Sequence, residues 1–348
     1  MVRQIASGCA ALLLGAVGGA IFWWLNLPLP WMMGSMVAAA IAAIGGVPVP
    51  PLNPLRPTML AVVGTMLGAS FSAGFFLSLP TFAIPLIGLT VSSFAAAAIA
   101  LWVLRRFAGL SSETAYFCAM PGGVIEMVTL AHERGGDDRI VALVHASRIF
   151  LVVLCLPFLF EWLTGMPAAR GSGSGVTLAD ISATDASWFV GVVAAGFALG
   201  MVVHLPARFM LAPMIVSMIV HVAGWTDFKL PFELIALAQV VIGVGIGARF
   251  ANVDRRLIMR TMGLSILVSV ILVAVSIVGA MVVGQITGMG LPSLMLSYAP
   301  GGLAEMSLIA LAMQLDVAFV VANHLFRVIL IIACAGLFFD VMKRRGWI

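Results

Sequence analysis

Charged residues are scarce in this chain. Only 9% of its 348 residues are Asp, Glu, Lys or Arg, whereas 62% are hydrophobic, and the mean hydropathy is +1.16. A soluble domain of this length needs a polar surface that so few charges cannot supply. The composition therefore excludes a soluble globular protein, and we expect the chain to lie in a lipid bilayer.

Several motifs that carry chemistry are also missing. The four cysteines show no CxxC spacing, which argues against a disulfide framework or a zinc site. No GxxxxGK[ST] segment is present, so the chain has no ATP-hydrolysing motor of its own. The five histidines show no HxH or HxxxH ligand spacing. We therefore predict a protein that is not an enzyme, with no catalytic residues, no metal site and no resident cofactor.

Hydrophobic runs long enough, or nearly long enough, to cross a bilayer predict ten transmembrane helices. A polar stretch that contains GSGSG separates the first five runs from the last five. We predict two membrane repeats, 1–165 and 187–348, joined by a polar linker at 166–186. The runs lie at about 5–25, 28–46, 57–74, 79–104, 140–163, 187–204, 206–224, 232–251, 260–285 and 317–341.

The two repeats carry the same motifs at an offset of 178 or 179 residues. MPGGVIEM at 120–127 matches APGGLAEM at 299–306, and the His-x-x-Arg pair that begins at His145 recurs at His324. A nearly constant offset over most of each half is typical of an internal duplication. The run at 5–25 is similar to a signal peptide, but its counterpart lies in mid-chain, so we expect a retained span.

Basic residues gather at opposite ends of equivalent spans. Arg105 and Arg106 close the fourth span, whereas Arg255, Arg256 and Arg260 open its counterpart. All of them lie in the cytoplasm if the repeats are inverted and each PGG segment is re-entrant. We therefore predict an all-α integral membrane protein with two inverted-topology repeats of five transmembrane helices plus one PGG-broken re-entrant hairpin each. Both termini would then be cytoplasmic, and the linker would lie outside. If the PGG segments instead crossed the bilayer fully, each half would have six spans and the repeats would be parallel.

The PGG sequence interrupts an apolar stretch that otherwise favours helix. Pro removes a backbone donor and Gly-Gly destabilises a helix, so we predict helical pieces at 112–119 and 124–133 around the first break. At ~1.5 Å per residue each piece is about 12–15 Å long, half of a ~30 Å hydrocarbon core. The break would lie near the midplane, where the N–H groups that begin the second piece favour an anionic group.

Glu126 and Glu305 lie about one turn beyond the two breaks. A carboxylate at this depth is costly unless it is protonated or paired, so each glutamate is a proton site, a sodium ligand or half of an ion pair. The ion-pair alternative joins them to Arg148 and Arg327 and makes PGG a packing kink. We favour the functional alternative because two crossed helix breaks are typical of a transporter site. The predicted substrate- and ion-binding residues are Pro121, Gly122, Gly123, Glu126, Pro300, Gly301, Gly302, Glu305, Arg148, Arg327, His145, His324 and Asn323.

The two PGG blocks, with LPLPWMMGSM, GTMLGASF and their second-half partners, resemble those of the AbrB-type duplicated membrane proteins of bacteria. The resemblance covers almost the whole chain. It implies labels of ammonia monooxygenase or of a regulator of gene expression. We discount the first because the histidines lack metal-ligand spacing, and a DNA-binding regulator because no segment could form a basic soluble domain.

The sequence therefore predicts a secondary transporter of the bacterial inner membrane that moves a small solute, driven by H+ or Na+. Two arginines and two helix N-termini favour a small organic anion, although arginines paired with the glutamates would leave a neutral site. A membrane sensor or regulatory protein linked to gene expression is the second hypothesis, and a membrane monooxygenase the third. The expected partners are the solute and the lipid bilayer, with no nucleic acid, and such folds are compatible with a homodimer.

Overall fold

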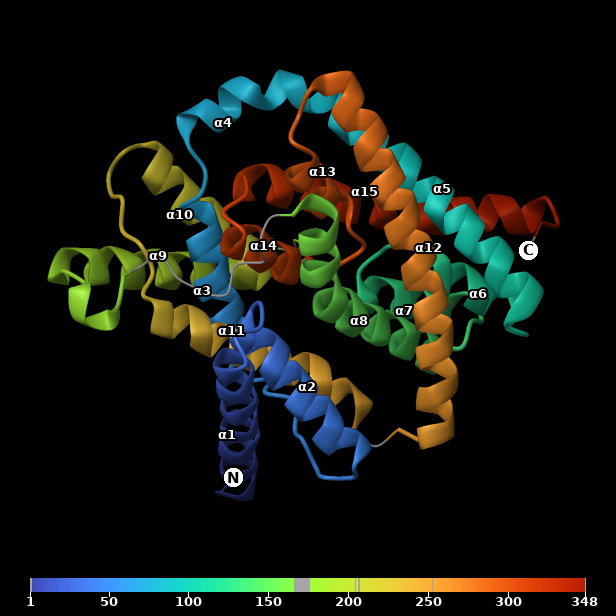
Figure 1. Cartoon of the computed structure of the whole chain (residues 1–348), viewed down its shortest axis with the longest axis horizontal. Coiled ribbons are helices and arrows are strands. Elements are labelled where there is room, and N and C mark those ends of the chain that lie inside the picture. Colours follow the sequence, from blue (N-terminus) through green and yellow to red (C-terminus); the bar gives the residue numbers. More distant parts are fainter. Residues whose placement is uncertain (1, 166–175, 204, 206, 252, 348) are drawn as a thin grey trace. The chain divides into compact units, whose positions relative to one another are not determined.

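The fold of the chain is all-helical. The structure is a computed structural model that describes the chain apart from residues 1, 166–175, 204, 206, 252 and 348 (Figure 1). Within the described residues every regular element is a helix, and no strand occurs. The predicted all-α class is confirmed in this respect, whereas the inverted arrangement of the repeats stays a prediction.

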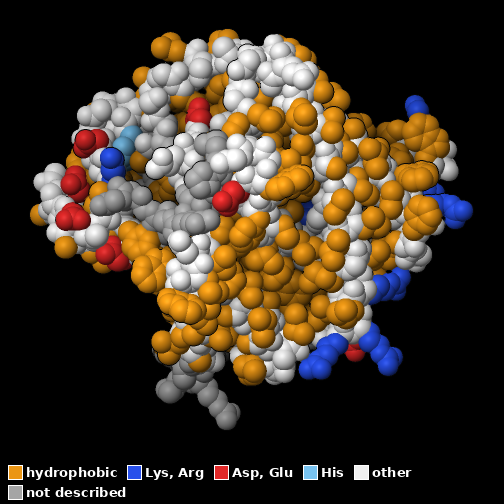
Figure 2. Space-filling view, in the orientation of Figure 1, with side chains coloured by type: hydrophobic (Ala, Val, Ile, Leu, Met, Phe, Trp, Pro, Cys, Tyr) orange, Lys and Arg blue, Asp and Glu red, His pale blue; other side chains and the backbone are white. Residues whose placement is uncertain are grey.

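Seven helical segments among the described residues are long and apolar enough to cross a membrane. Hydrophobic side chains also cover broad areas of the face shown in Figure 2, as expected of a protein whose solvent is lipid. The chain is thus built as a multi-pass membrane protein. The segments contain α1 (Val2–Trp24), α5 (Ala83–Phe107), α8 (Asp138–Thr164), α9 (Ala183–Val202), α11 (Phe232–Gly247), α12 (Arg255–Thr287) and α15 (Val317–Arg344).

Three of the ten predicted spans are helices too short to be counted among these seven. They are α2 (Pro30–Ile44), α3 (Arg56–Gly68) and α10 (Arg208–Val222), with 15, 13 and 15 residues. At ~1.5 Å per residue they are about 20–22 Å long, less than a ~30 Å hydrocarbon core. Their sequences are apolar because these helices are buried against other helices, so hydrophobicity alone overestimated their length.

One compact unit comprises Met1–Leu79, Pro157–Asn252 and Ser307–Ala318. Its centre is a pair of reciprocal crossings between the two sequence repeats: α3 packs on α10, and α11 packs on α2. A Cβ atom at Gly64 of α3 would collide with the Met210 carbonyl oxygen, and one at Gly243 of α11 would collide with the Met32 carbonyl oxygen. Backbones in such close contact require glycine at both crossings.

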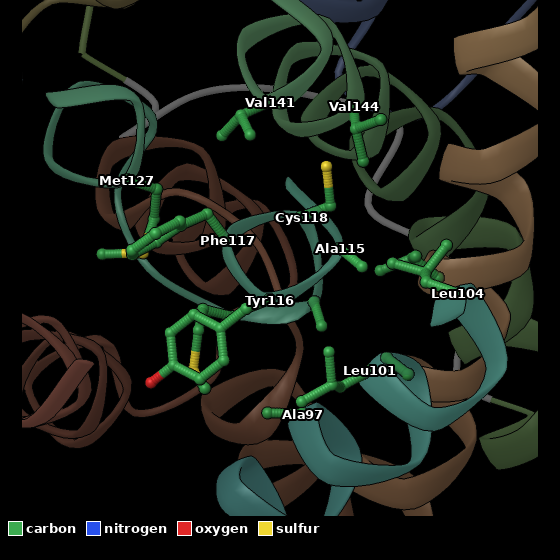
Figure 3. Close-up of a cluster of buried hydrophobic side chains, with 14 of the residues drawn as sticks. Ala97, Leu101, Leu104, Ala115, Tyr116, Phe117, Cys118, Met127, Val141 and Val144 are labelled. Atoms are coloured by element: carbon green, nitrogen blue, oxygen red, sulfur yellow. The ribbon is translucent and has the colours of Figure 1, made fainter. Parts of the chain in front are cut away.

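The other compact unit comprises Pro80–Leu156, Val253–Met306 and Phe319–Ile348. Its apolar core combines side chains of α5 and α8 with those of two short helices, α6 (Ser112–Ala119) and α7 (Val124–Glu133) (Figure 3). Ile331, Ala335 and Phe339 of α15 complete this core. Both units contain segments from both predicted repeats, so they divide the chain differently from the repeats 1–165 and 187–348.

The predicted linker at 166–186 is partly outside the described residues. Its described part contains a short 3-10 helix, Leu178–Asp180, and α9 begins at Ala183, before the predicted 187. Thr177 donates hydrogen bonds from its amide and its hydroxyl to the Asp180 carboxylate. These bonds hold the pKa of Asp180 below its usual range.

Candidate functional site

Each PGG sequence lies between two short helices. The first break, residues 120–123, separates α6 from α7, and the second, residues 299–302, separates α13 (Leu291–Tyr298) from α14 (Leu303–Ala312). The first helix of each hairpin has 8 residues and the second has 10. The bounds of α6 and α7 match the helical pieces expected at 112–119 and 124–133. Pro121 and Pro300, which have no N–H to donate, lie inside the breaks.

Arg148 of α8 is hydrogen-bonded to the carbonyl oxygens of the first break. Its Nη1 donates to Met120 O at 3.1 Å and its Nη2 to Gly122 O at 3.1 Å. The side chain is only 3% exposed. Carbonyl groups at a helix C-terminus lack intrahelical partners and carry partial negative charge. The guanidinium supplies both the missing donors and an opposite charge at the end of α6.

Arg327 of α15 makes the equivalent contacts at the second break. Its Nη1 donates to Ala299 O at 2.6 Å and its Nη2 to Gly301 O at 2.8 Å. Arg327 is 2% exposed, and the offset of 179 residues relates every atom pair to its counterpart at Arg148. The same buried guanidinium clamp therefore holds both breaks.

The two histidines brace the first helix of each hairpin. His145 Nε2 lies 2.8 Å from Phe117 O in α6, and His324 Nε2 lies 3.1 Å from Leu296 O in α13. Arg327 Nη2 also approaches His324 Nδ1 at 2.9 Å. Because a guanidinium can only donate, Nδ1 accepts and the proton of a neutral His324 lies on Nε2, which donates to Leu296 O. Both histidines thus contact the backbone of the hairpins.

Asn323 lies in the first half of α15 and is fully buried. Its Nδ2 donates to Phe319 O of the same helix at 2.9 Å, and its Oδ1 has no partner among the described residues. The position it would have in the first repeat is held by Val144. Asn323 is therefore a buried polar group that the two copies do not share.

Glu126 and Glu305 are turned back over the start of their own helices. A Cβ atom at Gly123 would collide with the Glu126 carboxylate, and a Cβ atom at Gly302 would collide with the Glu305 carboxylate. Glu305 is only 9% exposed, whereas Glu126 is partly buried. Among the described residues neither glutamate forms an ion pair or a hydrogen bond through its carboxylate. In this structure the arginines contact carbonyl oxygens, so the ion pairs considered from sequence do not form.

The glycines of the breaks differ in what their backbones can offer. The Gly301 N–H donates to Ala299 O at 2.9 Å, and its carbonyl accepts from Arg327. Both polar groups of Gly301 are therefore engaged within the hairpin. Gly123, in contrast, is the N-cap of α7, with φ −66° and ψ 147° and no side-chain cap. Backbone contacts with a solute thus fit the N-cap glycines better than Gly301.

The two breaks are neighbours within one compact unit. A Cβ atom at Gly122 would lie 3.0 Å from Ile331 Cγ2 of α15, so the first break packs one turn beyond Arg327. The helix that supplies Arg327 to the second break therefore also packs against the first break.

Both tyrosines of the chain hold the hairpins, which the sequence reasoning missed. Tyr116 Oη donates to Ala335 O of α15 at 2.7 Å, and Tyr298 Oη donates to Pro85 O of α5. Ser276 Oγ of α12 donates to Tyr298 O at 2.9 Å. The sequence did contain a signal for this role. The chain has only 2 tyrosines among 348 residues, and each precedes a PGG block by a few residues.

Comparison with known proteins identifies the family. The family model described as "Transition state regulatory protein AbrB" matches residues 5–343. The chain belongs to the AbrB family. The resemblance found in the repeated PGG blocks is thereby confirmed.

Two relatives of this AbrB-family chain match along almost their whole length. "Uncharacterized protein YhjN" of Bacillus subtilis is 28% identical over 358 residues, which cover 94% of this chain and 91% of the relative. "Putative regulator AbrB" of Escherichia coli is 25% identical over 329 residues, which cover 94% of this chain and 92% of the relative. Neither name assigns an enzymatic activity.

Proposed function

We propose that this AbrB-family chain is a secondary transporter of a bacterial inner membrane, which moves a small solute driven by a proton or sodium gradient. The observation that carries the proposal is the pair of helix breaks in one compact unit, each with a glutamate turned over the start of its second helix. Irregular backbone within an apolar protein is stable only where other groups satisfy it, and transporters use such broken helices as binding sites. The two termini would be cytoplasmic, as the distribution of basic residues requires.

The clamped breaks suit a site that must stay formed during transport. Arg148 and Arg327 satisfy the carbonyl groups at the ends of α6 and α13, so the hairpins need no water at their turns. The first amides of a helix have no intrahelical partner, so the helix starts beyond the two breaks are where a solute would bind. Glu126 and Glu305 would couple the solute to the ion, because both lie beside these amides.

Transport by the purified protein tests this proposal. A thermal-shift screen against small metabolites, at several pH values and sodium concentrations, would supply the solute. Uptake of that solute into proteoliposomes is then measured under an imposed proton or sodium gradient. We expect ion-driven uptake to be lost in Glu126→Gln and Glu305→Gln and retained in Asp227→Asn, whose carboxylate is exposed and outside the hairpins. Undiminished ion-driven uptake in both glutamine variants would exclude the coupling role.

A membrane sensor linked to gene expression is the second candidate. Its support is the wording of the family description and of the Escherichia coli relative, both of which speak of regulation. A sensor would bind the solute found in the screen but move none of it into proteoliposomes. Deletion of the gene would then change transcription even where the solute is not consumed.

A further inference from the structure

We propose that the start of α7 and the start of α14 are two sites for carboxylate anions, which the carboxylates of Glu126 and Glu305 fill in the absence of solute. The solute is accordingly a small carboxylate, and the coupling ion is the proton. This inference deepens the proposed function and relies on it only for the location of the site.

The first support is the geometry of the two helix starts. In both helices the first intrahelical amide bond comes from the methionine after the glutamate: Met127 N donates to Gly123 O at 3.0 Å and Met306 N to Gly302 O at 3.0 Å. The amides before it point out of the helix start, where the helix dipole is positive. Such a group of amides binds carboxylates and other anions.

The second support is that a carboxylate already lies at each site. Glu305 is more than nine-tenths buried, has no hydrogen-bond or ion-pair partner among the described residues, and is turned toward the N-cap glycine of its helix. Glu126 has the same conformation at Gly123. A buried carboxylate without an ion-pair partner is costly unless local dipoles stabilise it. The glutamates therefore show which chemical group these helix starts accept.

The carbonyl oxygens of the breaks argue for a proton and against sodium. A sodium ion needs several oxygen ligands, and exposed carbonyl groups at a break are the usual source in transporters. Here the carbonyls of Met120 and Gly122 accept hydrogen bonds from Arg148, and Arg327 occupies those of Ala299 and Gly301. Two buried guanidiniums beside the site also repel a cation and attract an anion.

The other ionisable side chains near the hairpins make contacts of their own. His145 and His324 are bonded to backbone carbonyls, Tyr298 donates to Pro85 O, and Arg148 lies beside the Cys118 thiol. The helices α5 and α12 carry charge only at one end. The ionisable groups around the site include, besides the two glutamates, Tyr116 and Cys118 of α6, His145 and Arg148 of α8, Tyr298 of α13, and His324 and Arg327 of α15.

The exchange conserves charge. A proton adds to a carboxylate oxygen of Glu126 or Glu305, and the neutral acid leaves the helix amides. The carboxylate of the solute then takes the place of the glutamate carboxylate at the helix start, so one anion has replaced another. Each transported carboxylate thus travels with one proton, and transport is expected to be electroneutral and insensitive to the membrane potential.

Binding of acetate and succinate to the full-length protein in nanodiscs tests the inference. The unfolding temperature is measured at pH 5 and pH 8 with their potassium salts and with potassium chloride at equal ionic strength. For wild type we expect stabilisation at pH 5. The half-maximal concentration of each salt should be higher at pH 8 than at pH 5. Asp227→Asn should behave like wild type.

Two variants separate the roles of charge and space. Glu126→Gln/Glu305→Gln removes the competing carboxylates, so both salts should stabilise it at pH 8 as well as at pH 5. Gly123→Ala/Gly302→Ala keeps every charge but fills the site with two Cβ atoms, so both salts should lose their effect. Even if the glutamine variant fails to fold, wild type and the alanine variant still decide the question.

Wild-type stabilisation that is equal at both pH values, or salts that stabilise neither wild type nor the glutamine variant, would overturn the inference. Unchanged stabilisation of the alanine variant would overturn it as well. Carboxylate binding without uptake would support the carboxylate sites and contradict the proposed transport function. Sodium-driven uptake of an uncharged solute, without any effect of acetate or succinate, would support transport and contradict the carboxylate sites.

Discussion

Arg134 at the end of α7 forms a two-pronged ion pair with Asp340 of α15. Nε lies 3.2 Å from Oδ1 and Nη2 lies 3.4 Å from Oδ2. The pair joins the first hairpin to the last helix of the second repeat. The second hairpin has no equivalent pair, because the matching positions hold Met313 and Glu161. The two hairpins are therefore anchored differently at their ends, although their breaks are held alike.

Removing this ion pair should loosen one hairpin only. Asp340→Asn removes one of two carboxylates from the partly exposed Arg134, which keeps its 3.4 Å contact with Glu133, and such pairs contribute about 0–1 kcal/mol. The free energy of unfolding should therefore change little, while amide hydrogen exchange quickens in α7 and stays unchanged in α14. Equal quickening in both hairpins would show that the pair does not anchor the first one specifically.

The guanidinium clamps cannot be replaced by lysine. Arg148→Lys keeps the charge but cannot reach Met120 O and Gly122 O together, because an ammonium is a single point on a flexible stem. Loss of a buried, charge-assisted hydrogen bond costs about 1.5–3 kcal/mol. We expect a lower unfolding temperature in detergent and a larger drop for Arg327→Lys, whose guanidinium also contacts His324. A lysine variant as stable as wild type would contradict the clamp.

The crossing of α11 over α2 provides a matched pair of glycine substitutions. Gly243→Ala should destabilise the protein by about 1–3 kcal/mol, because the new Cβ would collide with Ser35 Oγ and Met32 O. Gly245 lies in the same helix, but a Cβ there would meet nothing within 4 Å. Gly245→Ala should therefore be neutral or stabilising by up to about 1 kcal/mol. Thermal unfolding of the two variants compares them directly, and equal losses would refute the close crossing.

The inverted arrangement of the repeats gives a prediction about topology. In a variant without native cysteines, Ser174→Cys in the GSGSG linker should react with a membrane-impermeant maleimide in intact cells. Gly346→Cys, near the C-terminus, should react only after the membrane is permeabilised. Labelling of both positions from the same side would instead favour six spans per half and parallel repeats.

The sequence predicted those features that depend on local chemistry. Pro121 and Gly122 marked the helix break, and the helical pieces expected on either side, 112–119 and 124–133, match α6 and α7. The internal duplication then identified the equivalent residue in the other repeat. The lengths of α2, α3 and α10 were not predictable in this way, because a helix buried in protein and a helix buried in lipid have similarly apolar sequences.

Other features depend on contacts between distant residues. Arg148 was considered as a partner of Glu126, because opposite charges are the obvious pair in a sequence, but in the structure its donors meet backbone carbonyls. The role of Tyr116 depends on the Ala335 carbonyl, 219 residues away. Carbonyl groups leave no trace in residue identity, so such contacts are visible only once the fold is known.

The reciprocal crossings at Gly64 and Gly243 have a consequence for how the chain can be divided. Each repeat supplies one glycine-bearing helix and one helix that receives the glycine of the other repeat. A fragment that contains only one repeat would expose both surfaces and should aggregate or be degraded. Two separate fragments, one for each repeat, should instead assemble through these surfaces when they are produced in the same cell. The fold therefore requires the two helix crossings between the repeats but does not require a covalent link between them.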